Sequence, residues 1–369
     1  MAEIGPNTRL RVSPFYESTV KEGVAAFSPY NRMLMPTSYG HPRAEYDRLT
    51  KGVSLWDVAV ERQVAIEGPD AAAFTQMLCT RDLSRQKIGQ GKYVACCDHR
   101  GVIINDPVVL KLAEDKFWLS IADKDMLMWC RAIAAERGMN VDLHEPDVSP
   151  LAVQGPMAED VVAAVFGNWI RDIKFFWFAD AEINGIPVKI QRSGYSGQGG
   201  FEIYLTDGTR GDELWSIFRE AGAPWGIGPG NPSPVERIES GMLSFGGDTD
   251  DHTNPFEVRL ERYVDLDVAD DVVGIQALRR IKAEGPTRHQ LGLLLDDEEP
   301  QPGPVRWYDL EVEGQKVGDM TCGCWSFKFE RVIGFALISV NCQPGDRVTV
   351  VRQGVPVGAT LCDLPFSKA

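Results

Sequence analysis

Two similar stretches decide the fold that we expect, VAIEGPDAAAF at residues 64–74 and LAVQGPMAEDV at residues 151–161. Each begins with an apolar run typical of a strand, turns at a Gly-Pro pair and continues with residues that favour a helix. In each copy a predicted hairpin and a second predicted helix follow, which is the order of a β-α-β-β-α-β unit. Two such units in one chain predict a duplicated α+β body with antiparallel sheets.

The hairpins of the two copies are marked by their turns. Asn184-Gly185 is a strong hairpin signal in the second copy, and Asp98 to Gly101 forms the expected turn of the first copy. The repeat predicts that the two hairpins, and with them Asp106 and Glu202, occupy equivalent positions. The predicted strands are 93–97, 102–111, 175–183, 186–192 and 201–205; the predicted helices are 14–22, 124–137, 211–220 and 234–243.

The sequence pattern changes near Arg288, where short runs of alternating apolar residues begin, separated by turns that contain glycine. Such runs predict a small β-barrel. A chain of 369 residues is longer than one hydrophobic core usually holds. We therefore expect three domains: a discontinuous α+β domain over 1–55 and 145–285, a second α+β domain over 56–144, and a C-terminal β-barrel domain over 286–369.

Composition narrows the class of protein. The formal net charge of −15 argues against binding to nucleic acid, which is itself a polyanion. No apolar run approaches the roughly 20 residues that span a bilayer, and the first residues lack a basic segment followed by an apolar core. We expect no membrane contact and a cytoplasmic location, with the protein acting as a monomer or homodimer.

The sequence predicts no metal site. Cys322 and Cys324 are close in sequence, but no second pair supplies the other ligands that zinc needs, so we expect both thiols to be structural. Asp248, Asp250 and Asp251 do not have the spacing of an EF-hand loop. A solvated turn is the expected structure for these three aspartates.

Two carboxylates stand out beside glycine and aromatic residues. Asp106 borders an apolar run and Glu202 lies within a predicted strand, so each residue is either solvated or placed at a functional site. The glycine-rich turn at 194–200 precedes a strand instead of a helix, which argues against a nucleotide loop. Its glycines would let the backbone pass close to a flat ligand. The aromatic run 175–178 is either core or, with Tyr195, a box for a cation.

Several stretches together resemble the glycine-cleavage T-protein family of aminomethyltransferases, and they are spread over most of the chain. They are LWDV (55–58), GVIIND (101–106), QGP (154–156), RSGYSG (192–197), FE (201–202), RIE (237–239) and NPFE (254–257). The resemblance implies three domains around a central channel that holds tetrahydrofolate.

The same resemblance assigns roles to individual residues. Asp106 matches the catalytic aspartate of the family, and Glu202 matches the glutamate that binds the pterin ring. Tyr93 and Tyr195 match aromatic residues of the folate pocket, and Phe175 falls where the family often has a tyrosine. Apart from these matches, we expect the rings of Tyr195 and Trp177 to present their faces to a cationic substrate.

Departures from the family pattern indicate a subgroup. Aminomethyltransferases carry Asp-Val-Ser-His-Met, whereas residues 57–61 here read DVAVE, and Ser233 stands where their Gly-x-Arg-Asp motif has arginine. WDVAVERQ (56–63), TRDLS (80–84) and NDPVV (105–109) instead resemble the dimethylsulfoniopropionate demethylases of this family. In the turn, Tyr195 and Gly197 replace the tryptophan and lysine of those demethylases.

The resemblance therefore implies a tetrahydrofolate-dependent demethylase that moves a methyl group from an onium donor, such as dimethylsulfoniopropionate, to N5 of tetrahydrofolate. The alternatives are an aminomethyltransferase-like enzyme, or another folate-dependent demethylase with a betaine, methylamine or methoxy donor. A non-catalytic folate-binding relative is a third possibility. The relatives of that kind have a cysteine in the glycine-rich turn, and this chain has none there.

Overall fold

The computed structural model describes residues 9–296 and 307–367, and the chain divides into two compact units. The first unit comprises Met1–Ala72, Gln86–Lys92 and Val108–Ser233; the second comprises Ala73–Arg85, Tyr93–Pro107 and Pro234–Ala369. The division into three domains at residues 55, 144 and 285 stays a prediction. In the described residues no helix is long and apolar enough to cross a membrane.

A six-stranded sheet forms the larger half of the first unit, in the order β12-β13-β14-β11-β3-β15. All neighbours are antiparallel except β15, which pairs parallel to β3. The β12–β13 hairpin turns at Asn184-Gly185, where both residues have positive φ, as predicted. The strands are β3 (Ser54–Asp57), β11 (Ser149–Gln154), β12 (Phe178–Ile183), β13 (Ile186–Gln191), β14 (Gly200–Leu205) and β15 (Gly228–Gly230).

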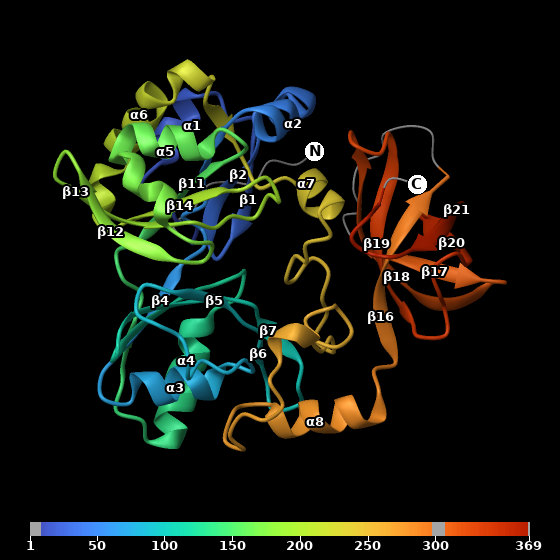
Figure 1. Ribbon diagram of the computed structural model, residues 1–369. Coiled ribbons are helices and arrows are strands. Elements are labelled where there is room, and N and C mark those ends of the chain that lie inside the picture. Colours follow the sequence, from blue (N-terminus) through green and yellow to red (C-terminus); the bar gives the residue numbers. More distant parts are fainter. Residues whose placement is uncertain (1–8, 297–306, 368–369) are drawn as a thin grey trace. The chain divides into compact units, whose positions relative to one another are not determined.

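Helices α1 (Tyr16–Lys21), α5 (Ala158–Phe166) and α6 (Gly211–Ala221) gather beside this sheet (Figure 1). Helix α6 buries Leu214, Trp215 and Phe218, which share one face at helical spacing. These side chains join a core that includes Leu151, Val153 and Ile203 of the sheet. Helix α2 (Pro42–Lys51) begins at a proline, and the β1–β2 hairpin (Ala26–Tyr30, Met33–Ser38) precedes it.

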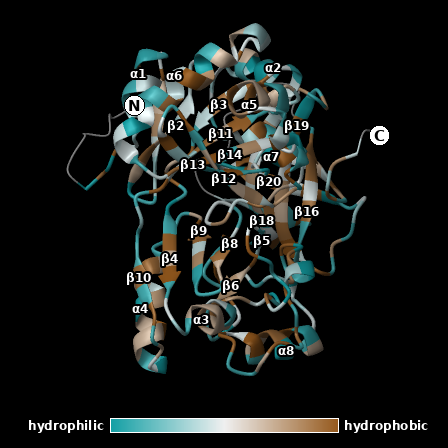
Figure 2. Cartoon of the chain, turned by 60° about the vertical axis from the view of Figure 1, so that its left-hand side comes forward, coloured by the Kyte–Doolittle hydropathy of each residue, from teal (hydrophilic) through white to brown (hydrophobic). Residues whose placement is uncertain are grey.

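A second, five-stranded sheet has the order β10-β4-β9-β8-β5. Its apolar residues colour strands such as β4 brown in Figure 2. Helix α4 (Met126–Arg137) begins where Asp125 accepts a hydrogen bond from the Met128 amide and ends at Gly138 in the left-handed conformation. The strands are β4 (Gln63–Glu67), β5 (Gly91–Tyr93), β8 (Val108–Ala113), β9 (Lys116–Ser120) and β10 (Asp142–His144).

The second unit contains the predicted C-terminal barrel, which closes in the order β16-β19-β18-β17-β20-β21. Helix α7 (Pro234–Glu239) packs on strands β18 and β19, and α8 (Ile275–Glu284) directly precedes the barrel. The short pair β6 (Cys96–Cys97) and β7 (Ile103–Asn105) also belongs here, as does most of α3 (Ala71–Leu78). The barrel strands are β16 (Arg288–Leu295), β17 (Tyr308–Val312), β18 (Gln315–Ser326), β19 (Arg331–Ser339), β20 (Arg347–Arg352) and β21 (Val355–Cys362).

The structure corrects several of the predicted elements. The strand expected over 93–97 is divided between the end of β5 and β6, and the strand expected over 175–183 begins at Phe178. The strand expected over 102–111 is interrupted at Asp106-Pro107: β7 pairs with β6, whereas β8 pairs with β9 in another sheet. Proline has no N–H for a ladder and favours such a break. The helix expected over 234–243 ends at Glu239.

The expected equivalence of Asp106 and Glu202 is also wrong. Glu202 lies on β14, which neighbours β11, and the strand in the same relation to β4 is β9. Asp106 instead follows β7, which lies in the separate two-stranded pair with β6. The two carboxylates therefore come from different positions of the repeat.

The strand-turn-helix repeat itself is confirmed in detail. Gly68 has φ of 124° and Gly155 has φ of 122°, a conformation that side chains rarely tolerate. In both copies the helix starts three residues after the glycine and its first amide donates to the glycine carbonyl, at 3.0 Å. The same local sequence thus makes the same turn twice.

The two glycines provide a matched test of close packing. A Cβ at residue 155 would lie 2.5 Å from the Gly52 carbonyl oxygen and 2.8 Å from that of Leu49, whereas at residue 68 the nearest atom is the Asn140 oxygen at 3.0 Å. We expect the strain of positive φ, about 1–3 kcal/mol, in both alanine variants, with a larger loss for Gly155→Ala. Urea unfolding measures both, and an equal loss in the two variants would contradict this account.

Candidate functional site

Asp106 directly follows β7 in the second unit and is only partly exposed. The Tyr93 hydroxyl donates a hydrogen bond of 2.7 Å to Asp106 Oδ2. Burial raises the pKa of Asp106 to about 7, and the bond from Tyr93 opposes this shift without cancelling it. Asp106 therefore exchanges its proton near neutral pH.

Aromatic and basic groups hold Tyr93 in place. Its ring meets the ring of Tyr263 edge-on, with 4.8 Å between the centroids. The Arg81 side chain donates to the Tyr93 carbonyl at 2.9 Å and lies 5.3 Å from the centre of the Tyr263 ring. These contacts fix the hydroxyl that bonds Asp106.

Three buried thiols lie on or next to strand β6. Cys79, Cys96 and Cys97 are all buried. The pKa of Cys96 is raised by its contact with the Cys79 thiol and by burial, and that of Cys97 is raised mainly by burial. Raised pKa values keep these two thiols neutral, so they act as apolar packing beside Asp106.

Glu202 lies on β14 in the first unit, with only 8% of its surface exposed. The hydroxyls of Ser193 and Tyr204 both donate to Oε2, at 2.7 and 3.0 Å. Burial raises the pKa of Glu202, while the two hydroxyl bonds lower it. Because both bonds use Oε2, Oε1 is left for a donor from outside the described residues.

Gln191 extends this group along the sheet. It pairs with Glu202 in the register of β13 and β14, and its Oε1 lies 2.9 Å from the Tyr204 hydroxyl, whose single proton is shared between Gln191 and Glu202. The Gln191 Nε2 atom is buried and has no hydrogen-bond partner among the residues described. A free carboxylate oxygen and an unpaired amide donor therefore lie in one buried group.

The glycine-rich turn packs on a glutamine instead of lying open. Gln154 Nε2 donates to the Ser193 carbonyl at 3.1 Å, and the Ser196 hydroxyl donates to Gln154 Oε1 at 2.8 Å. A Cβ at Gly194 would overlap the Gln154 amide. The glycines are thus required for this close approach, which fixes the turn beside Ser193.

The aromatic residues singled out in the sequence differ in how far they are buried. Phe175 is 65% exposed, so the core interpretation is wrong for this residue. Its ring meets that of Phe176 at 4.4 Å between centroids, and Phe176 has a positive φ of 60°. Trp177 packs at the edge of the sheet core, and Tyr195 is partly buried in the turn.

Sequence reasoning missed the groups that support Glu202. Tyr204 lies two residues after Glu202 on the same strand, so strand alternation places both on one face. Gln191 is the last residue of the neighbouring strand β13, and Ser193 lies two residues beyond its end. Alternation was a usable signal for Tyr204, whereas the contact with Ser193 depends on the path of the glycine-rich turn.

The other singled-out groups have structural partners. Cys322 and Cys324 are buried on β18, and burial raises both thiol pKa values. Within residues 9–296 and 307–367 no three His, Cys, Asp or Glu side chains are grouped to hold a metal ion. The expected solvated turn is wrong for Asp248, which is fully buried against Arg237 at 2.7 Å.

Comparison with known proteins identifies relatives along the whole chain. The model of the GCVT N-terminal domain matches residues 15–268, and that of the glycine cleavage T-protein C-terminal barrel domain matches residues 288–368. The chain is 39% identical to dimethylsulfoniopropionate demethylase DmdA of Ruegeria pomeroyi, over 96% of this chain and 99% of that protein. It is 29% identical to an aminomethyltransferase of Caldanaerobacter subterraneus, over 97% and 96% of the two chains.

A solved structure of an aminomethyltransferase is also similar to this chain over nearly its whole length. The glycine cleavage system aminomethyltransferase T from Bartonella henselae superposes with a TM-score of 0.85 and 25% sequence identity, covering 97% of this chain and 98% of that one. The mixed α/β body and the six-stranded barrel are thus common to both. The chain belongs to the glycine-cleavage T-protein family, whose members are tetrahydrofolate-dependent one-carbon transferases.

Proposed function

We propose that this protein is a tetrahydrofolate-dependent demethylase whose methyl donor is an onium compound of the dimethylsulfoniopropionate type. The observation that carries the proposal is the 39% identity to DmdA over nearly the whole of both chains. The residues DVAVE at 57–61 and Ser233, which replace motifs typical of aminomethyltransferases, support the same choice.

The group around Glu202 fits the pterin end of a folate. A pterin ring presents N–H donors and carbonyl and nitrogen acceptors along one edge. Glu202 Oε1 is free to accept from such donors, and the unpaired Gln191 Nε2 provides a donor in the same group. Leaving these buried polar atoms unpaired is costly, so a ligand that pairs them gains affinity.

Asp106 is proposed to act at the reacting end. When bound, tetrahydrofolate supplies the N5 amine that accepts the methyl group. Methylation of that amine would bring positive charge to the nitrogen and would release its proton. A carboxylate held out of water stabilises such a charge more strongly than a solvated one. With a pKa of about 7, Asp106 is also suited to take up the released proton.

Methyl transfer from an onium donor requires few catalytic groups from the protein. When the methyl carbon leaves a sulfonium, the electron pair of the C–S bond stays on sulfur and a neutral thioether departs. The protein therefore needs to align the two reactants and exclude water. Tyr195 and Trp177 are proposed to present ring faces to the cation, an interaction of about 0.5–2 kcal/mol per ring, while Tyr93, Tyr195 and Phe175 contact the folate.

An aminomethyltransferase-like activity remains the second candidate, because aminomethyltransferases such as that of Caldanaerobacter subterraneus are similar over nearly the whole chain. Its folate product would be methylene-tetrahydrofolate, whereas the demethylase produces methyl-tetrahydrofolate. Demethylation of betaine, methylamine or methoxy donors would give other demethylated products.

The donor is tested by incubating the protein with tetrahydrofolate and a panel of sulfonium, betaine, methylamine and methoxy compounds. We expect dimethylsulfoniopropionate to be converted, with methyl-tetrahydrofolate formed in equal amount. Both products are followed by mass spectrometry. Turnover of glycine with a lipoyl carrier alone, giving methylene-tetrahydrofolate, would overturn the proposal.

The pKa of Asp106 predicts how activity depends on pH. If the carboxylate is the active form, kcat falls below about pH 7 as Asp106 becomes protonated. In Tyr93→Phe the hydroxyl bond that favours the carboxylate is lost, so the pKa of Asp106 rises and the falling limb shifts to higher pH. Asp106→Asn should abolish turnover while it retains much of the folate affinity. Full activity of Asp106→Asn would exclude the assigned role.

Folate binding is predicted to depend on the ionised form of Glu202. Glu202→Gln replaces an acceptor by a donor, and we expect folate affinity to fall at least about tenfold, as a lost charged hydrogen bond costs about 1.5–3 kcal/mol. Tyr204→Phe removes one of two bonds to Oε2 and should weaken binding less. Fluorescence titration with tetrahydrofolate measures both, and Tyr308→Phe, a buried barrel tyrosine, is the control. Unchanged affinity in Glu202→Gln would place the pterin elsewhere.

A further inference from the structure

The segment that ends at Asp106 is tied to a loop of the second unit. The Ile103 amide, at the start of β7, donates a hydrogen bond of 2.9 Å to the carbonyl of Thr253. On its other side β7 pairs with β6 through Asn105 and Cys96. The loop over residues 247–257 therefore supports one edge of the segment that carries Asp106.

This loop has no helix or strand of its own, and two acidic side chains shape it. Asp250 accepts hydrogen bonds from the Thr253 hydroxyl at 2.7 Å and from the His252 amide at 2.9 Å. Glu257 accepts from the Asn254 amide at 3.0 Å. Thr253 is fully buried. The hydrogen bonds to the two carboxylates fix the loop around it, and they therefore fix the position of its carbonyl.

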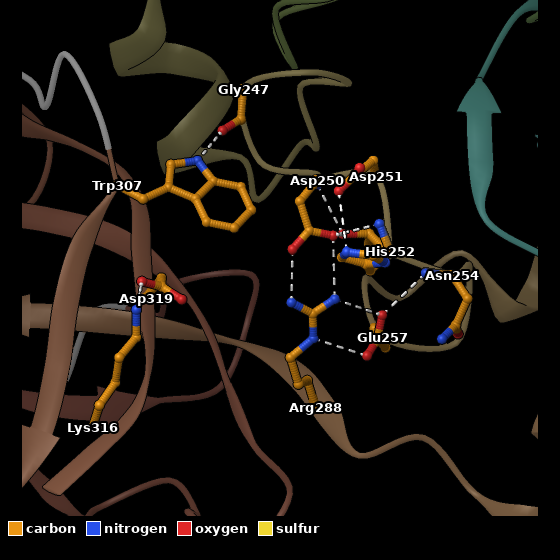
Figure 3. Close-up of polar contacts among 11 residues, drawn as sticks. Gly247, Asp250, Asp251, His252, Asn254, Glu257, Arg288, Trp307, Lys316 and Asp319 are labelled. Carbon is orange, nitrogen blue, oxygen red and sulfur yellow. Dashed lines mark hydrogen bonds and ion pairs between the residues drawn. The ribbon is translucent and has the colours of Figure 1, made fainter.

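Arg288, the first residue of β16, joins the two carboxylates (Figure 3). Its Nη1 donates to Asp250 Oδ2 at 2.9 Å, and its Nε and Nη2 donate to the two oxygens of Glu257 at 3.0 and 3.1 Å. Glu257 is only 4% exposed. Without Arg288, a buried carboxylate would stand unpaired beside a second negative charge, and the loop would rearrange.

We propose that Arg288 is a positioning residue for methyl transfer, because its bridge between Asp250 and Glu257 fixes Thr253 and thereby the strand that directly precedes Asp106. The inference rests on the proposed role of Asp106 at the reacting end. The planar guanidinium is required, since a single ammonium group cannot bond both oxygens of Glu257 and reach Asp250 in one geometry.

The barrel offers a matched control. Lys316 also bridges two carboxylates, with bonds of 2.7 Å to Asp309 and to Asp319. The Asp319 contact is visible in Figure 3, away from the loop. The Lys316 side chain is 52% exposed, and the pair should contribute little. Lys316→Met therefore removes a cation of the same barrel without touching the segment before Asp106.

The local effect is tested by hydrogen–deuterium exchange of the full chain. In Arg288→Met we expect faster exchange in the peptide over residues 100–107, since the Ile103 bond to Thr253 loosens. Arg288→Lys should be intermediate and Lys316→Met should match the wild type. Unchanged exchange in a folded Arg288→Met protein would overturn the inference.

The catalytic effect is measured as a split between kcat and KM. With dimethylsulfoniopropionate and tetrahydrofolate, Arg288→Met should lower kcat per folate-binding site about tenfold or more, as expected for a displaced reacting group, with KM for folate changed less than about twofold. Arg288→Lys should recover part of kcat. Loss of folate sites at an unchanged kcat per site would indicate a merely structural role and contradict the proposal.

Two further arms keep the result decisive. Thr253→Val is the second variant if Arg288→Met does not fold. It removes the hydroxyl bonded to Asp250 but keeps the backbone carbonyl, so we expect smaller changes of the same kind in hydrogen exchange and in kcat. No change in either quantity would refute the inference. If the wild type transfers no methyl group from any donor, the proposed function fails, whereas the exchange experiment still decides whether Arg288 holds the segment before Asp106.

Discussion

The proposed chemistry depends on two carboxylates that are held out of water. Hydroxyl groups, instead of cations, form hydrogen bonds to both of them. Asp106 is bonded by the Tyr93 hydroxyl, and Glu202 by the hydroxyls of Ser193 and Tyr204. A hydroxyl stabilises a carboxylate but does not neutralise it, so burial prevails and both pKa values stay raised. When either group is ionised, its charge is therefore not balanced by a cation among the residues described, and a ligand can interact with it.

Carboxylates with a structural role are treated differently in the same chain. Asp248 pairs with Arg237, and Asp250 and Glu257 share Arg288. Burial raises the pKa of Asp250, but its bonds from Arg288 and Thr253 outweigh burial and lower it. Asp57, the last residue of β3, resembles the two site carboxylates more than it resembles these ion pairs. It is buried, it accepts hydrogen bonds from the Ser13 hydroxyl and the Ala59 amide, and burial raises its pKa to about 6.

The sequence was sufficient where local rules decide the structure. The Gly-Pro turns, the Asn184-Gly185 hairpin, the helix end at Gly138 and the barrel all follow from residue type and spacing, and all are present. It was insufficient where the outcome depends on long-range partners. The strand break at Asp106-Pro107 redirects β8 to β9, and Asp250 finds Arg288 far along the chain. The supporting groups of Glu202 depend on β-sheet register and on a turn packed against Gln154.

A raised pKa at Asp106 also implies that the chemistry proposed for this residue lowers the stability of the fold. The ordinary pKa of the group is 3.8 and that in the folded protein is about 7. Between these values the folded state binds a proton that the unfolded state does not, so the contribution of Asp106 to the free energy of unfolding falls as pH rises through this range. Above pH 7 the folded protein carries the full cost of the buried charge. A stable fold alone would favour a neutral residue here, so the cost of the buried carboxyl supports the chemistry proposed for Asp106.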